Sequence, residues 1–85
     1  MEYNTVFTDE AIKDMDGLDK KELSRIIKKL KWFAKQENPL NFAKRLQYDA
    51  IGQYRFRIGD YRVIFDCEEK NIRILRVGHR SSIYK

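Results

Sequence analysis

Apolar residues recur at two different spacings along the chain, and the change separates a helical half from a stranded half. Residues 3–7 alternate as in a short strand, and Thr8 can cap a short helix that ends at Gly17. A longer helix is predicted from Asp19 to the residues before Asn38-Pro39, because its apolar positions recur every three or four residues. Its apolar stripe consists of Leu23, Ile26, Ile27, Leu30, Phe33 and Ala34.

In the second half the apolar spacing changes to two, which is the period of a strand with one buried face. Two alternating runs, 53–58 and 61–66, flank Gly59-Asp60, a pair that suits the two-residue type II′ turn of a hairpin. Residues 72–77 are predicted to form a last strand, which Gly78 is expected to end. The second half therefore predicts an antiparallel meander.

The predicted order of elements is β-α-α-β-β-β. The connector 40–50 is expected to contain only one helical turn, around residues 42–46. Strands that gather on one side of the helices in this way are typical of an α+β domain. We expect a single domain spanning residues 1–85, with two helices packed on one face of a mainly antiparallel four-stranded sheet.

The composition argues against several other classes of protein. Cys67 is the only cysteine, so no internal disulfide is expected. No charged-then-apolar leader precedes the first strand, and no apolar run approaches the roughly 20 residues that span a bilayer. One histidine, one cysteine and scattered carboxylates form no metal-ligand set of usual spacing, and the four glycines are isolated. We therefore expect a cytoplasmic protein with no membrane contact, no metal, no cofactor and no small-molecule substrate.

The net charge of +5 is concentrated in the second half of the chain. Residues 1–50 contain ten Lys/Arg against nine Asp/Glu, whereas residues 51–85 contain eight against four. Six of those eight cations are arginine, whose planar fork binds phosphate in a bidentate manner. This positive charge indicates an anionic partner, with nucleic acid the first candidate and an acidic protein the second.

The predicted hairpin places three arginines on the face that the helices leave open. If residues 58 and 61 flank the turn, Arg57 lies directly opposite Arg62, and Arg55 shares their face two residues further along. Like charges so placed destabilise a sheet unless water screens them or an anion binds. One interpretation is a phosphate-binding face; the other is that these side chains point into solvent or pair with Asp60 and Asp66.

The C-terminal tail adds groups suited to RNA chemistry. His79 and Arg80 follow the last strand, and Tyr84 follows four residues later. Taken singly, each of these residues is more often structural. Beside the arginines they supply cations for a reacting phosphate, a group that exchanges protons near neutral pH, and an aromatic ring that can stack on a base.

Two segments carry a resemblance to a known family. The chain resembles the RelE/ParE toxin superfamily at residues 54–65 (YRFRIGDYRVIF) and at residues 77–84 (VGHRSSIY). The likeness extends to the helix exit Asn38-Pro39-Leu40, to the stretch Ala43-Lys44-Arg45-Leu46 and to the order of elements.

The resemblance implies the toxin of a type II toxin–antitoxin pair, of the RelE-like branch that cuts messenger RNA in the ribosomal A site. Its partners would be the ribosome, mRNA and a cognate antitoxin that neutralises it. The RNA 2′-hydroxyl would attack the adjacent phosphate without a metal. The implied roles are RNA or phosphate binding for Arg55 and Arg57, stabilisation of the phosphate for Arg62 and Arg80, and stacking or orientation for Tyr84.

One departure from the family pattern affects proton transfer. The family's best-known member has lysines at the two hairpin positions, where this chain has Arg55 and Arg57. Arginine stays charged in proteins, so neither can be the general base. His79, with an unperturbed pKa of about 6.5, is the residue we assign to proton transfer, with Tyr84 as a second participant.

Two alternatives share the fold. One is a ParE-like toxin that inhibits DNA gyrase, although such toxins generally lack the tail cluster. The other is a catalytically inactive module whose arginines only bind RNA or the antitoxin.

Overall fold

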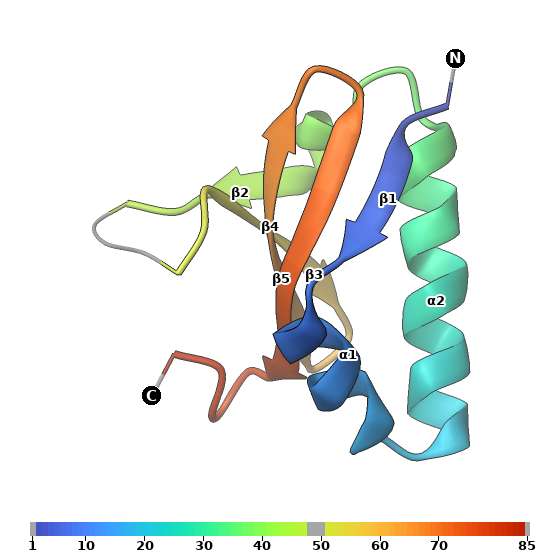
Figure 1. The fold of residues 1–85 in the computed structure, drawn as a ribbon, viewed down its shortest axis with the longest axis vertical. Coiled ribbons are helices and arrows are strands. Elements are labelled where there is room, and N and C mark those ends of the chain that lie inside the picture. Colours follow the sequence, from blue (N-terminus) through green and yellow to red (C-terminus); the bar gives the residue numbers. More distant parts are fainter. Residues whose placement is uncertain (1, 48–50, 85) are drawn as a thin grey trace.

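The computed structural model describes residues 2–47 and 51–84, which form a five-stranded sheet with two helices. The strands lie in the order β1-β5-β4-β3-β2, with β1 parallel to β5 and every other pair antiparallel (Figure 1). The elements along the chain are β1 (Asn4–Phe7), α1 (Asp9–Asp16), α2 (Lys20–Lys35), a 3₁₀ turn (Pro39–Phe42), β2 (Ala43–Arg45), β3 (Tyr54–Ile58), β4 (Tyr61–Glu68) and β5 (Asn71–His79).

Both helices begin where their capping residues predict. The Thr8 side chain accepts a hydrogen bond from the backbone N–H of Ala11 at 3.1 Å, and the Asp19 carboxylate accepts one from the N–H of Glu22 at 2.9 Å. These bonds satisfy donors that the first helical turn leaves free, each contributing about 1 kcal/mol. The predicted helix boundaries are confirmed.

The α+β class is confirmed, but the number of strands is five rather than four. The connector 40–50 does not place its helical turn around residues 42–46: the turn covers Pro39–Phe42, and Ala43–Arg45 then pairs with β3 as strand β2. Three residues are too few to show an alternating pattern, and β2 is fixed by pairing with a distant partner. The end of that connector, residues 48–50, lies outside the described residues.

Strand β5 extends further than the pattern predicts. Gly78 does not end it; it lies inside β5, directly opposite Arg62. A Cβ atom at Gly78 would lie 2.8 Å from Cδ1 of Ile83, so the glycine makes room for the tail to pack on the strand. The reason for the glycine is thus a tertiary contact, which the local sequence does not reveal.

The main core lies between α2 and the sheet. Three phenylalanine rings stack through it: Phe33 of α2 on Phe56 of β3 at 4.0 Å between centroids, and Phe56 on Phe65 of β4 at 4.2 Å. All three are at most 4% exposed. Residues Ile26, Leu30, Val63 and Ile74 join the same cluster. Within residues 2–47 and 51–84, neither α1 nor α2 has the length and apolar composition of a membrane span.

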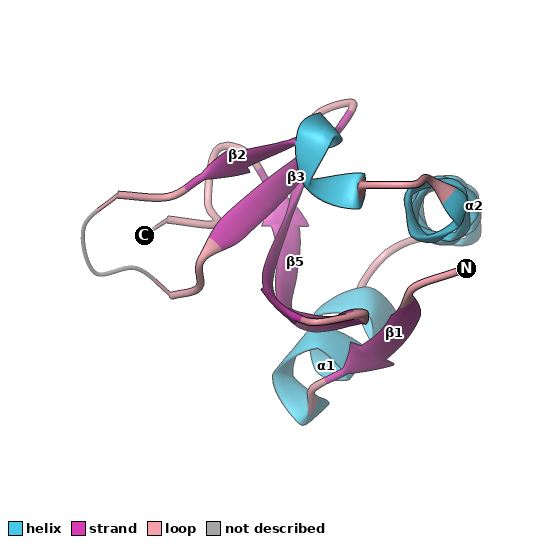
Figure 2. Ribbon diagram, turned by 90° about the horizontal axis from the view of Figure 1, so that it is seen from above, coloured by secondary structure: helices cyan, strands magenta, loops and turns pink. Residues whose placement is uncertain are grey.

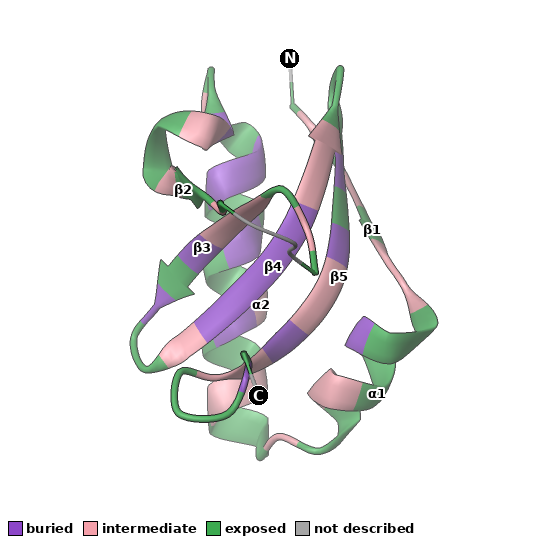
Figure 3. Ribbon diagram, turned by 90° about the vertical axis from the view of Figure 1, so that its left-hand side faces the viewer, coloured by how far each residue is buried: buried purple, intermediate pink, exposed green. Residues whose placement is uncertain are grey.

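A smaller apolar cluster lies on the opposite face of the sheet. Figure 2 shows α2 on one side of the strands and the C-terminal tail on the other. Ile64 is fully buried on that second side. A Cβ atom at Gly52 would lie 2.7 Å from Ile64 Cγ2 and 2.8 Å from Leu75 Cδ1, so only glycine fits there without a shift of these side chains. Ile83 is 7% exposed and covers Gly78. The tail is therefore held against the sheet (Figure 3).

Helix α1 covers the part of β5 that extends beyond β1. The Asp14 carboxylate accepts hydrogen bonds from Nε of Arg76 at 2.8 Å and from the backbone N–H of Val77 at 2.9 Å. Burial alone would raise the pKa of Asp14, but the hydrogen bonds from Arg76 and Val77 outweigh burial and lower this pKa below its usual value. Arg76 therefore has a structural role, because it holds α1 against β5.

Candidate nucleic-acid interface

The hairpin register that the turn predicts is present in the structure. Gly59 has φ 60°, as the first position of a type II′ turn requires, and residues Ile58 and Tyr61 pair directly on either side of the turn. Arg57 therefore lies opposite Arg62. Opposed cations destabilise the pair of strands, so the site keeps a repulsion that an anion would relieve.

Arg62 is the centre of this cationic cluster, and it is buried. Only 9% of the residue is exposed, and its Nη1 donates hydrogen bonds to the carbonyl oxygens of Gly59 at 3.1 Å and Tyr61 at 3.0 Å. The turn that places Arg57 opposite Arg62 thus also fixes the Arg62 guanidinium. Within residues 2–47 and 51–84, no ion pair involves Arg62, Arg55 or Arg57, which disfavours the alternative that they pair with neighbouring acids.

The neighbours that change the pKa of Arg62 define the rest of the cluster. Burial lowers this pKa most, and the positive charges of Arg55, Arg57 and Arg80 lower it further, whereas Tyr84 acts in the opposite direction. Arg55 lies two residues from Arg57 on β3, and Arg55 and Tyr84 line the same depression. With Arg80 acting on Arg62, five of the six residues predicted for the site lie on this side of the hairpin. A group whose charge is disfavoured by burial and by like charges gains most when a phosphate binds.

The tail presents Arg80 and Tyr84 through an anchored turn. After β5 the backbone N–H groups of Ser82 and Ile83 donate to the His79 carbonyl, and the N–H of Arg80 donates to the Asp60 carbonyl at 2.8 Å. The Arg80 side chain also lies 3.7 Å from the Asp60 carboxylate, in an exposed ion pair. Tyr84 is 53% exposed. Ile83, which the sequence reasoning did not single out, holds this turn against Gly78.

A depression of about 440 Å³ lies beside the cluster. Arg55 and Tyr84 belong to the cluster and also line this depression. The rest of its lining comes from residues 44–47, of which 44 and 45 lie on β2. Lys44 faces Arg55 across the β2–β3 pair, so it extends the cationic face. The sequence noted Lys44 and Arg45 only as part of the resemblance, because the signal that places them is the long-range strand pairing.

The structure does not bring His79 to the arginines. His79 pairs with Tyr61, so its ring lies on the α2 side of the sheet, and the two ring centroids are 5.5 Å apart. Its Nδ1 lies 2.8 Å from the Ser81 hydroxyl. Arg62, the next residue after Tyr61, points to the opposite face, since side chains alternate along a strand. Proton transfer by His79 at the Arg62 cluster has no geometric support.

This arrangement can bind a phosphodiester and stabilise charge that develops on it. Fixed cations in a partly dehydrated site act more strongly on an anion than cations in water do. Tyr84, exposed beside them, is available for a nucleobase. No group of three or more His, Cys, Asp or Glu side chains in the described part of the chain is placed to hold a metal ion.

Several solved structures with the same fold are toxin–antitoxin complexes. The chain superposes on a chain of the RelBE2 toxin–antitoxin complex of Mycobacterium tuberculosis with a TM-score of 0.78 and 28% identity, covering 94% of this chain and 100% of the other. It superposes on one from the archaeal RelE–RelB complex of Pyrococcus horikoshii OT3 with a TM-score of 0.72 and 26% identity, covering 96% and 99%. The fold and the site define a toxin domain of the RelE/ParE superfamily.

Sequence comparison assigns the chain to one family within that superfamily. Residues 5–84 match the family of the ParE toxin of the type II toxin–antitoxin system parDE. The chain is also 32% identical over 87 residues to toxin RelG of Mycobacterium tuberculosis, an alignment that covers 100% of this chain and 99% of RelG. The protein belongs to the ParE toxin family of type II toxin–antitoxin systems.

Proposed function

We propose that this toxin is a metal-independent endoribonuclease that cuts messenger RNA in the ribosomal A site. The observation that carries the proposal is the buried Arg62, which hydrogen bonds to the hairpin turn fix in place and which lies among Arg55, Arg57, Arg80 and Tyr84. A rigid cluster of guanidinium groups beside an exposed aromatic ring suits a phosphodiester and its base.

In the proposed reaction the RNA supplies its own nucleophile. The 2′-oxygen attacks the neighbouring phosphorus, the bond from phosphorus to the 5′-oxygen breaks, and the products are a 2′,3′-cyclic phosphate and a free 5′-hydroxyl. One proton leaves the 2′-hydroxyl and one reaches the departing 5′-oxygen. Arg62 and Arg80 stabilise the additional negative charge on the phosphate, and Arg55 and Arg57 hold the flanking backbone.

Tyr84 is the residue to which we assign orientation of the nucleotide. Among the groups that change the pKa of Arg62, Tyr84 is the only one that is not a cation. We therefore assign proton exchange at the proposed phosphate site to Tyr84 rather than to His79, whose ring faces Tyr61. The four arginines remain charged and transfer no proton.

The proposed partner is an antitoxin that neutralises the toxin. The two superposed structures of RelE-like chains are both toxin–antitoxin complexes. With the net charge of +5, an acidic segment is the natural complement. The proposed location is the cytoplasm, where ribosomes and mRNA are present.

Toe-printing of a defined messenger in a translation extract tests this proposal. The wild-type protein is expected to produce codon-resolved cuts only while the messenger is being translated. The variant Arg62→Ala, added at the same concentration, is expected to produce none. Cuts that appear equally on naked RNA, or an absence of cuts by folded wild-type protein, would contradict the proposal.

Inhibition of DNA gyrase is a second candidate function, because the matching family is that of the ParE toxin. This function requires no RNA cleavage, and it predicts that the purified toxin blocks supercoiling of a relaxed plasmid by gyrase. The Arg62 cluster and the anchored Tyr84 favour the nuclease. A supercoiling assay run beside the toe-print separates the two functions directly.

A further inference from the structure

The hairpin turn between β3 and β4 contacts both of the arginines that we assign to the reacting phosphate. The Gly59 carbonyl accepts a hydrogen bond from Arg62 Nη1 at 3.1 Å, and the Asp60 carbonyl accepts one from the backbone N–H of Arg80 at 2.8 Å. The turn therefore holds the guanidinium of one arginine and the backbone of the other, although the two belong to different segments of the chain.

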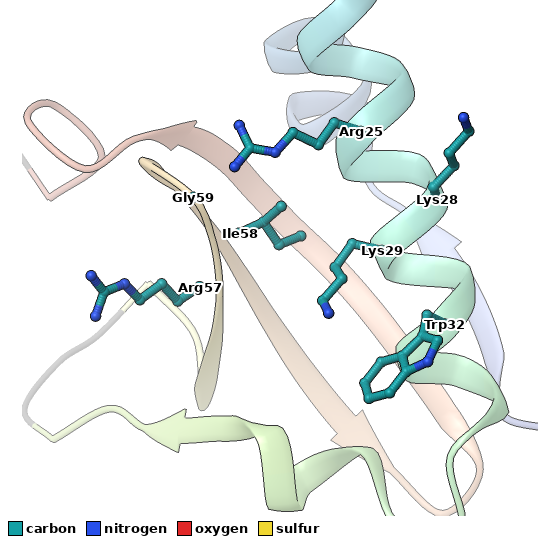
Figure 4. Close-up of a pocket in the computed structure, with 7 residues that line it drawn as sticks. All are labelled: Arg25, Lys28, Lys29, Trp32, Arg57, Ile58 and Gly59. Atoms are coloured by element: carbon teal, nitrogen blue, oxygen red, sulfur yellow. The ribbon is translucent and has the colours of Figure 1, made fainter.

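The turn is itself held in place by α2. Figure 4 shows the side chain of Arg25 extending from α2 to the turn at Gly59. A Cβ atom at Gly59 would collide with the Arg25 guanidinium, so this contact requires a glycine, which also adopts the φ of 60° that the turn needs. Because a two-residue loop packed against a helix has few alternatives, the fold also defines where Asp60 lies.

The strand register places Asp60 beside Arg80. Tyr61 pairs with His79 at the end of the β4–β5 ladder, and Asp60 and Arg80 are the next residues on the two strands. The Asp60 carboxylate lies 3.7 Å from Arg80 Nε, and the two side chains are 70% and 61% exposed. Such an exposed pair contributes little to stability. Its consequence is the position that it gives to the Arg80 guanidinium.

Arg80 needs a counter-charge to stay at the site. Its positive charge lowers the pKa of the buried Arg62, so the two guanidinium groups repel each other, and a phosphate that meets Arg62 also lies in the field of Arg80. Within residues 2–47 and 51–84, Asp60 is the one acid that forms an ion pair with Arg80. This pair involves Nε, which leaves the Nη atoms available to a phosphate.

We propose that Asp60 is a positioning residue that holds the Arg80 guanidinium beside Arg62, so that both arginines meet the reacting phosphate. Asp60 itself contacts no RNA and transfers no proton. This role rests on the proposed nuclease function, since it explains how one of the arginines assigned to that reaction is oriented.

The Asp60 carboxylate has opposite effects on RNA binding and on cleavage. Its negative charge repels the RNA backbone, so removal of the charge leaves RNA binding unchanged or makes it tighter. Its contact with Arg80 matters most when negative charge develops on the phosphate, so the same removal slows the chemical step. A residue that only stabilised the fold would not separate binding from cleavage in this way.

Asp60→Asn tests this role, because asparagine suits the second position of a Gly-X turn and removes only the charge. Single-turnover cleavage of ribosome-bound messenger should be about tenfold slower. Binding of an oligonucleotide with a 2′-deoxyribose at the cut site, which lacks the nucleophile, should weaken by less than about twofold or become tighter. Asp60→Glu keeps the charge and should restore part of the rate. Glu68→Gln, which removes an exposed acid at the opposite end of β4, should change neither property.

A double variant shows whether Asp60 acts through Arg80. In the Arg80→Ala background, Asp60→Asn should slow cleavage by less than about twofold further, because the group that it positions is gone. Three results would overturn the proposal: the same tenfold loss in both backgrounds, faster cleavage by Asp60→Asn, or a loss of RNA binding that equals the loss of rate.

A measurement on the protein without RNA keeps this role separate from the nuclease. Asp60→Asn should shift the NMR signal of the Arg80 Nε–H group, whereas Glu68→Gln should leave it in place. An unchanged signal in Asp60→Asn would contradict the positioning role. Wild-type protein that does not cut a translated messenger would count against the nuclease alone, because this signal does not depend on cleavage.

Discussion

The hairpin turn fixes the position of the Arg62 guanidinium, and this position determines what the site can bind. The carbonyl groups of Gly59 and Tyr61 fix its Nη1 atom, while burial and neighbouring cations disfavour its charge. A residue in this state gains both a counter-ion and new hydrogen bonds when a phosphate arrives. Arg57, directly opposite and exposed, contributes charge at a lower desolvation cost.

At His79 the sequence-based interpretation and the geometry lead to different expectations. His79→Ala is expected to keep RNA cleavage within about threefold of wild type, because its ring faces Tyr61 on the far side of the sheet. Cleavage of a translated messenger, measured over time, checks this outcome. A loss of about 100-fold or more, the usual effect of removing a general base, would restore His79 to the mechanism.

Tyr84 offers a complementary test. Tyr84→Phe keeps the ring and removes the hydroxyl, whereas Tyr84→Ala removes both. If the residue only stacks on a base, the phenylalanine variant should retain activity and the alanine variant should lose about 1–3 kcal/mol of RNA binding. If the hydroxyl exchanges a proton, both variants should lose cleavage, and the pH dependence of the rate should change. Binding and single-turnover rates, measured separately, distinguish these results.

Among the elements, α1 depends on a contact made far along the chain. Asp14→Asn weakens the hydrogen bonds to Arg76 and to the backbone of Val77, so we expect the free energy of unfolding to fall by about 1–3 kcal/mol. Urea denaturation of the variant measures this change. The matched substitution Asp16→Asn, at the end of the same helix, should have an effect of about 0.5 kcal/mol or less.

The pH dependence follows from the same carboxylate. The pKa of Asp14 is lower in the folded chain than its unfolded value of about 3.9. Its contribution to stability is therefore complete above that unfolded pKa and is lost as the pH falls through the folded pKa. The stability difference between wild type and Asp14→Asn should be constant near neutral pH and should shrink in acid. A difference that grew on acidification would contradict this linkage.

The C-terminal tail is the element that couples the fold to the site. Ile83→Ala should cost about 2 kcal/mol of stability and should also reduce cleavage, because Arg80 and Tyr84 lose their anchored turn. Ile12→Ala, at a residue that is 45% exposed, serves as the control and should change neither property appreciably. A destabilised Ile83→Ala variant with unchanged cleavage, measured well below its melting temperature, would show that the tail position is not needed.

Much of the whole molecule could be predicted because its signals are local. The caps at Thr8 and Asp19, the helical stripe of α2 and the Gly59-Asp60 turn each depend on neighbours within a few residues. The turn also fixed the register, and with it the opposition of Arg57 and Arg62. Strand β2, the place of Gly78 within β5 and the anchoring of the tail by Ile83 depend on contacts between distant segments. Local patterns do not record such contacts.

The residues of the candidate site also fall into those that local patterns place and those that depend on long-range pairing. Arg55, Arg57 and Arg62 could be placed from strand alternation and one turn. His79 was assigned by its chemistry alone, and its face of the sheet follows from the pairing of β4 with β5.

At the scale of the whole molecule, the net charge predicts strongly salt-dependent RNA binding. For a single strand, the logarithm of the binding constant falls with the logarithm of salt concentration by about 0.7 for each phosphate contacted. Arg57→Gln should reduce this slope by about one contact, whereas Arg73→Gln, on an exposed part of β5 at the far end of the strand, should leave it unchanged. Equal slopes for all three proteins would mean that Arg57 contacts no phosphate.

The rate of cleavage by Arg62→Ala in a single turnover on ribosome-bound messenger tests the central claim most directly, with Arg73→Ala as the matched control. If the Arg62 cluster stabilises the reacting phosphate, Arg62→Ala should be slower by about 100- to 1,000-fold, the usual cost of removing one such donor, while Arg73→Ala remains within about threefold of wild type. A folded Arg62→Ala variant that cuts at the wild-type rate would contradict the account.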